Sequence, residues 1–186
     1  MAADGAIIPR QMVRKLLIPM LLTAFCAVLA RADSISAPTE QWGQLRPADR
    51  IVVRKASRKM ELYREGQVIA SFRVSLGLVP EGHKQREGDF RTPEGSYRLT
   101  RRNAQSEFFL AVQVSYPEST DIALARRNGW SPGGLIMVHG LPNVPKYPRD
   151  RYLNTDWTDG CIALSNEDML DFWLLTGQGT PIEIRP

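Results

Sequence analysis

Short stretches in which apolar and polar residues alternate, separated by glycine and proline, limit most strongly what this chain can fold into. In the clearest stretch, Val68 to Leu76, every second residue is apolar. A period of two places those side chains on one face of a β-strand. The turn residues Glu65 and Gly66 connect this stretch to a second one around Met60 and Leu62, so the sequence predicts a β-hairpin here.

The rest of the chain repeats this pattern and contains few helical stretches. One helix is predicted at Asp121–Asn128 and another at Glu167–Thr176, where Ser165 is placed to cap the first turn. Many short strands with one or two short helices predict a mainly β domain with α+β decoration, a β-sandwich or a barrel-like fold. The other predicted strands are Ile51–Val53, Tyr97–Leu99, Leu110–Val114, Leu135–Val138, Ile162–Leu164 and Ile182–Ile184.

The first 32 residues have the layout of a secretory signal. A basic segment at residues 10–15 precedes an uncharged, mostly apolar run of 15 residues, and Ala30-Arg31-Ala32 supplies a small-x-small cleavage pattern. A membrane span needs about 20 apolar residues, so the run is short for one. We expect a signal peptide at residues 1–32 and an exported protein, with an uncleaved membrane anchor and lipidation at Cys26 as the alternatives.

The basic charge of the chain comes largely from this targeting segment. The net charge is +4 for the whole sequence, and it falls to +1 without residues 1–32, which hold four basic residues and one acidic residue. The other Lys and Arg residues alternate with acids, so nucleic acid is not an expected partner. Residues 33–49 are predicted to be a lead-in or tether. Residues 50–186 form the predicted domain, which is long enough to fold without a disulfide or a metal.

The chain has two long turn-rich segments, 79–95 and 140–157. Two residues whose side chains can take part in catalysis flank the second one. His139 follows a predicted buried strand, and Cys161 directly precedes another. A thiolate is a strong nucleophile, and a neighbouring imidazole can take the thiol proton and return it to a leaving amine. A buried inert thiol is the alternative for Cys161. A zinc site is poorly supported, because His83, His139 and Cys161 are too few ligands of the usual kinds, and no cofactor is expected.

The residues around this pair form longer motifs. Ile136-Met-Val-His139-Gly140 and Thr158-Asp-Gly-Cys161-Ile-Ala-Leu-Ser-Asn166 resemble the signature of the L,D-transpeptidase catalytic domain (YkuD type). The upstream segment Gly88-Asp-Phe-Arg-Thr-Pro-Glu-Gly95-Ser-Tyr97 is similar to the turn that precedes a strand in that family. The resemblance covers residues 51–184, and it identifies the predicted domain as an L,D-transpeptidase-like catalytic domain.

The resemblance implies an enzyme that acts on peptidoglycan stem peptides. Cys161 would attack a peptide carbonyl to form a thioester, which an amine resolves by cross-linking or attachment, or which water hydrolyses. His139 would be the general base and acid, and the Gly140 carbonyl would orient its ring. The amides around Asp159, Gly160 and Cys161 would form the oxyanion hole.

The sequence departs from the family pattern at Asp159, where His is frequent, at Ala163, where Arg or Asn is frequent, and in its longer interval between the His and the Cys. An Arg at position 163 would bind a substrate carboxylate, so Arg91, Arg149 and Arg151 are candidates to replace it.

These departures resemble a YafK-like branch, for which membership implies hydrolytic release of a wall-linked lipoprotein in a periplasm. An inactive wall-binding module is the alternative from another class.

Overall fold

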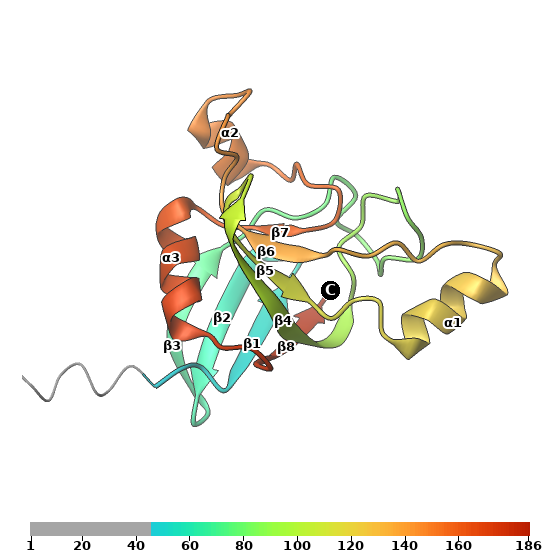
Figure 1. Ribbon diagram of the computed structural model, residues 1–186, viewed down its shortest axis with the longest axis horizontal. Helices are drawn as coiled ribbons and strands as arrows, with labels where there is room; N and C mark the ends of the chain where they lie inside the picture. Colours follow the sequence, from blue (N-terminus) through green and yellow to red (C-terminus); the bar gives the residue numbers. More distant parts are fainter. Residues whose placement is uncertain (1–45) are drawn as a thin grey trace, which may run out of the picture. The chain divides into compact units, whose positions relative to one another are not determined.

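Within residues 46–186, the part of the chain that this computed structural model describes, eight strands form one mixed sheet (Figure 1). The predicted signal peptide and residues 33–45 of the predicted lead-in lie outside the described residues. In chain order, the strands are β1 (Arg50–Arg54), β2 (Lys59–Arg64), β3 (Gln67–Arg73), β4 (Gly95–Ser106), β5 (Phe109–Val114), β6 (Met137–His139), β7 (Ile162–Ala163) and β8 (Pro181–Arg185). The helices are α1 (Ser119–Arg127), α2 (Arg149–Asn154) and α3 (Asn166–Leu175).

The order of the strands in the sheet is β3-β2-β1-β8-β4-β5-β6-β7. The chain beyond β3 returns to the opposite edge, where Ser75 lies across from Ala163 of β7. Two backbone hydrogen bonds join them, from Ser75 N to Ala163 O at 2.9 Å and from Ala163 N to Ser75 O at 2.8 Å. This bridge brings the two edges of the sheet together, so the predicted mainly β, barrel-like fold class is confirmed.

The hairpin of β2 and β3 confirms the alternating pattern, with two differences at its ends. Val68 is 50% exposed, because it lies beside the turn and beyond the core. β3 ends at Arg73, although Val74 and Leu76 continue the pattern and are buried. They remain in the core because the chain leaves β2 at this point and pairs with β7 instead.

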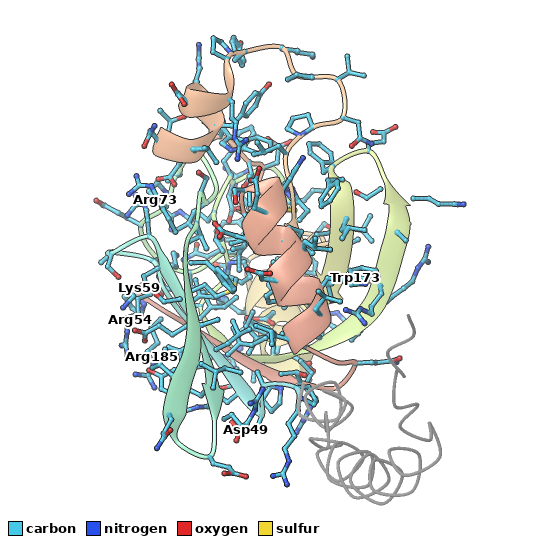
Figure 2. All side chains as sticks on the ribbon, turned by 90° about the vertical axis from the view of Figure 1, so that its left-hand side faces the viewer. Asp49, Arg54, Lys59, Arg73, Trp173 and Arg185 are labelled. Carbon is cyan, nitrogen blue, oxygen red and sulfur yellow. The ribbon has the colours of Figure 1, made fainter. Side chains whose placement is uncertain are left out.

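Helix α3 covers the core between the β1–β3 strands and the β4–β5 hairpin (Figure 2). Asp168 N donates to the Ser165 side chain at 3.0 Å, as the sequence predicts for the cap of this helix. Two residues of the helix, Met169 and Phe172, are fully buried in the core. On the side facing β4, the guanidinium of Arg102 lies 3.9 Å from the centre of the Trp173 ring.

The other two helices differ more from the prediction. α1 begins two residues earlier than predicted, because Glu118 and Asp121 form a capping box ahead of it. α2 falls inside the segment expected to be a loop. Its six residues bury only Tyr152, so no helical period of apolar residues marks it in the sequence. None of the helices in residues 46–186 is long and apolar enough to span a membrane.

The strand predicted at Leu135–Val138 is shifted towards the C-terminus. β6 includes His139 and excludes Leu135, which is 70% exposed and has a φ of +56°. A positive φ breaks the extended conformation, so pairing with β5 starts only at Met137, which lies opposite Gln113. His139 is therefore part of the sheet and does not simply follow it.

The long segment 79–95 is attached to the domain by a buried lysine. The Lys55 side chain is 2% exposed, and its Nζ donates to Gly82 O at 2.6 Å, Thr92 O at 2.9 Å and Glu94 Oε1 at 2.8 Å. His83 in the same segment is not the solvated residue that its charged neighbours suggest. Its Nε2 lies 3.2 Å from Asp121 Oδ1, and its Nδ1 accepts from Glu94 N at 3.0 Å.

The basic residues on the outer side of the β1–β3 strands are paired with acids. Figure 2 shows Arg54, Lys59 and Arg185 on the side of these strands that faces away from α3. Glu61 accepts from Arg54 and Lys59, and Glu183 accepts from Arg185. This alternation of charges matches the balanced composition of the domain.

We expect the substitution Lys55→Met to lower the free energy of unfolding by about 3 kcal/mol, because it leaves two carbonyls and the Glu94 carboxylate without their buried donor. Urea unfolding followed by circular dichroism measures this. The control Lys59→Met removes a half-exposed lysine of β2, and we expect a loss of about 0.5 kcal/mol or less. Equal losses in the two variants would contradict the anchoring role of Lys55.

Candidate active site

The parallel pairing of β6 with β7 brings His139 and Cys161 to one place. Val138 lies opposite Ile162, and His139 lies opposite Ala163. Cys161 directly precedes β7, and its Sγ accepts from Met137 N at 3.4 Å and lies 3.7 Å from Leu135 O. His139 follows Met137 by two residues, so both side chains lie on the same face of β6. Cys161 and His139 line one cavity of about 380 Å³.

The imidazole of His139 is held in one orientation. Its side chain is buried, and its Nδ1 lies 2.7 Å from Gly140 O. A carbonyl oxygen only accepts, so in the neutral ring Nδ1 carries the proton and Nε2 is the free acceptor. Phe108 and Trp157 flank the ring, with centroid distances of 4.7 Å and 5.6 Å. The geometry thus provides a base whose acceptor nitrogen is defined.

Burial keeps both members of the pair uncharged. It lowers the pKa of His139 to about 4, although the Gly140 carbonyl acts in the opposite direction. Burial also raises the pKa of the Cys161 thiol, and the Met137 amide offsets this only in part. At neutral pH the resting site therefore holds a thiol beside a neutral imidazole.

The turn before Cys161 requires glycine. Gly160 has a φ of +130°, and a Cβ at this position would lie 2.6 Å from Arg91 O. Thr158 Oγ1 fixes the turn, since it donates to Cys161 O at 2.7 Å and accepts from Gly160 N at 3.2 Å.

The Gly160 amide thus already donates a hydrogen bond, to Thr158 Oγ1. Of the three amides predicted for an oxyanion hole, those of Asp159 and Cys161 donate to no partner within the described residues.

Gly140 leaves no room for a side chain. A Cβ there would lie 2.7 Å from Asn166 Oδ1 and 2.9 Å from the Cβ of Phe109. Its amide donates to both Phe108 O and Leu110 O at 3.1 Å, and the next amide, of Leu141, donates to Asn166 Oδ1 at 2.8 Å. These contacts fix the peptide whose carbonyl orients His139.

None of the three predicted arginines lines the cavity of Cys161, although Arg151 lines a larger cavity that adjoins it. Arg149 is paired with Glu167 on the surface, and Arg151 lies 3.8 Å from the centre of the Tyr147 ring. The main chain of Arg91 packs against Gly160, while its guanidinium lies beside Gly82. Among the described residues, no arginine lines the cavity that holds Cys161 and His139.

A second cavity, of about 860 Å³, adjoins the first and shares Glu107, Phe108 and Trp157 with it. The tip of the β4–β5 hairpin and the segment 140–157 form its walls. Asn143 connects these two walls: its Nδ2 donates to Ser106 O at 2.8 Å, its amide donates to Glu107 O at 2.9 Å, and its Oδ1 accepts from Phe109 N at 2.9 Å.

Sequence reasoning did not identify Phe108, Trp157 or Asn143 as parts of the site. The two consecutive aromatic residues at the hairpin turn, Phe108 and Phe109, were the available signal, because large aromatic side chains at a turn need a partner to cover them. Residues 46–186 contain no cluster of three or more His, Cys, Asp or Glu side chains that could hold a metal ion.

The L,D-transpeptidase catalytic domain family (YkuD) matches residues 48–184, nearly all of the described part. The chain belongs to this family. Membership supports an activity on peptidoglycan. Among its relatives is YafK of Escherichia coli K12, which is named as an L,D-transpeptidase. The two sequences are 27% identical over 133 residues. That stretch is 67% of this chain and 51% of YafK, so the chain spans about half the length of this relative.

Solved structures share the fold of this L,D-transpeptidase family member. The helical cell shape determining protein Pgp2 of Campylobacter jejuni has a TM-score of 0.56 at 23% identity, over 75% of this chain and 48% of Pgp2. Bd1075 of Bdellovibrio bacteriovorus has a TM-score of 0.51 at 23% identity, over 75% of this chain and 51% of that protein. At this identity the likeness shows the fold.

We expect Gly140→Ala to abolish turnover while the protein stays folded. The added methyl group displaces Asn166 or Phe109, so the Gly140 carbonyl no longer faces His139 Nδ1. Turnover assays and thermal melts measure the two effects. Gly177→Ala is the control, because a Cβ there has its nearest neighbour, Thr180 Oγ1, at 3.9 Å, and we expect it to retain activity. A fully active Gly140→Ala enzyme would show that the carbonyl does not orient the base.

His139 should make the stability of the fold depend on pH. Above the ordinary histidine pKa of about 6.5 it is neutral in both the folded and the unfolded chain. Below that pH, the unfolded chain binds a proton that the folded chain takes up only near pH 4. We expect protonation of this residue to lower the free energy of unfolding by about 2 kcal/mol between neutral pH and about pH 4.5.

Urea unfolding of the wild type and of His139→Gln at both pH values isolates this effect, because all other titrating groups are common to the two proteins. The wild type should lose more stability on acidification than the variant. The same loss in both would mean that His139 titrates normally in the folded chain.

Proposed function

We propose that this chain is an exported cysteine enzyme that cleaves a peptide bond in peptidoglycan stem peptides and holds the product as a thioester on Cys161. The observation that carries this proposal is the shared cavity in which the thiol lies with His139, whose Nδ1 is occupied by Gly140 O and whose Nε2 is therefore an acceptor. Family membership supports the peptidoglycan substrate.

The first half of the reaction forms the thioester. The Cys161 proton passes to His139 Nε2 while the sulfur attacks the substrate carbonyl carbon. The negative charge that develops on the carbonyl oxygen is accepted by the free amides of Asp159 and Cys161. The C–N bond then breaks, and the proton on His139 goes to the departing amine.

The second half returns the enzyme to its starting state. An amine of another stem peptide attacks the thioester, loses a proton to His139 and forms a new amide, and the thiol is released with that proton. This is the transpeptidase outcome, either a cross-link or an attachment to peptidoglycan. Water in place of the amine gives hydrolysis. A hydrolase that releases a wall-linked lipoprotein is the second candidate, which the departures of the sequence at Asp159 and Ala163 from the family pattern favour.

The proposed substrate and the N-terminal segment both bear on where the protein is located in the cell. A basic, then apolar N-terminal segment supports export to the periplasm, with a retained N-terminal anchor as the alternative. Pgp2, which shares the fold, is described as determining helical cell shape, so a role of this chain in cell wall biogenesis and cell shape is part of the proposal. The mass of the mature N-terminus distinguishes cleavage from anchoring.

Cys161→Ala should abolish turnover of tetrapeptide muropeptides and of lipoprotein-loaded peptidoglycan while the fold is retained. Mass spectrometry of the products separates the outcomes, because transfer joins two muropeptides and hydrolysis adds one water. Intact-mass measurement of the wild type should detect the acyl-enzyme. Tyr63→Phe, on the outer side of the β-sheet and distant from the cavity, is the control that should keep wild-type turnover.

Full turnover by Cys161→Ala would overturn the thioester mechanism. An inactive wall-binding module predicts a different pattern, in which neither the wild type nor the variant releases product although both bind peptidoglycan.

A further inference from the structure

The sulfur of Cys161 becomes negatively charged when its proton leaves, so the charges that surround it affect the reaction. None of the predicted arginines lines its cavity. The segment 79–95, which Lys55 anchors from outside, nevertheless contains a buried lysine of its own, Lys84, whose side chain is 4% exposed. The proposed mechanism does not use it.

Asp89 holds Lys84 in place. Its Oδ1 accepts from Lys84 Nζ at 2.8 Å and from Arg91 N at 3.1 Å, while its Oδ2 accepts from the amides of Gln85 at 2.7 Å and Arg86 at 3.1 Å. Asp89 is thus fully bonded, and these bonds keep its carboxylate ionised. The Lys84 ammonium has three N–H donors, and within the described residues only Asp89 accepts from it.

The short chain that follows Asp89 touches the turn that carries the nucleophile. A Cβ at Gly77 would lie 2.2 Å from Phe90 O, and one at Gly160 would lie 2.6 Å from Arg91 O. Gly77 N also donates to Thr92 Oγ1 at 3.0 Å. The position of the Lys84–Asp89 pair is therefore coupled to the backbone next to Cys161.

The charge of Lys84 reaches the sulfur. Burial raises the pKa of Cys161 and the Asp159 carboxylate adds to this, whereas the Met137 amide and the Lys84 ammonium act in the opposite direction. Lys84 is the only cation among these influences. Since it is buried, its field at the sulfur is weakly screened by water and salt.

We infer that Lys84 is an electrostatic positioning residue of the site, held by Asp89 so that its ammonium favours negative charge on the Cys161 sulfur and on the carbonyl oxygen beside it. This rests on the proposed function for its role in turnover. In the absence of a cation at position 163, Lys84 supplies positive charge from the segment 79–95, whose backbone at Arg91 packs against Gly160 in the turn before Cys161.

Two alkylating reagents that differ only in charge test this inference without any peptide substrate. Iodoacetate is anionic, iodoacetamide is neutral, and both react with the thiolate. Their rate ratio therefore cancels changes in the amount of thiolate and reports the charge near the sulfur. We expect Lys84→Met to lower the iodoacetate-to-iodoacetamide ratio about five- to tenfold, and Lys84→Arg to restore most of it.

The rate of iodoacetamide alkylation as a function of pH is the second readout. Loss of Lys84 should move its midpoint to higher pH. Lys55→Met is the matched control, because it removes the other buried lysine that holds the segment 79–95. It should leave the ratio within about twofold of the wild type, provided that a thermal melt shows the variant folded at the assay temperature.

If Lys84→Met does not fold, Asp159→Asn replaces it. Without the opposing carboxylate, Lys84 should give Cys161 a higher iodoacetate preference than free glutathione has. A wild-type ratio in folded Lys84→Met, or no such preference in Asp159→Asn, would overturn the inference. Turnover by Cys161→Ala would refute the thioester mechanism, yet the alkylation ratio of Cys161 would still report on Lys84.

Discussion

The parallel pairing of β6 with β7 is the interaction on which the site depends. Both strands are very short, and their pairing places His139 beside β7, which Cys161 directly precedes, although 22 positions separate the two residues in the chain. β7 is held on its other side by the bridge between Ser75 and Ala163. The closure of the sheet thus fixes the strand that Cys161 directly precedes, and the geometry of the site follows from the topology of the whole domain.

Burial has opposite consequences for the two reacting groups, and the site uses both. A desolvated imidazole stays neutral and can accept a proton over a wide range of pH, whereas a desolvated thiol holds its proton until an acceptor is in place. The pair therefore stays unreactive at rest. The Gly140 carbonyl orients the His139 ring, and in the proposed mechanism the turn amides and Lys84 favour the negative charge that appears as bonds change.

The sequence was sufficient to predict the family and the fold class, because the residues around His139 and Cys161 form motifs and because strands with strict alternation are recognisable without a structure. It was not sufficient for the surroundings. Phe108 and Trp157 reach His139 through a hairpin tip and a long loop, neither of which has a periodic pattern.

Lys84 stands in a highly charged segment and therefore resembles a solvated residue. Its burial depends on Asp89, which accepts one hydrogen bond from Lys84 and three from backbone amides, and no local pattern encodes these bonds.

Asn143 has a consequence for the shape of the larger cavity. Its three hydrogen bonds fasten the tip of the β4–β5 hairpin to the segment 140–157, and these two pieces of chain form the walls of that cavity. Moving one wall away from the other would break those bonds. Asn143 therefore sets the width of the cavity, so a molecule that enters it meets a groove of given width rather than a hinged flap.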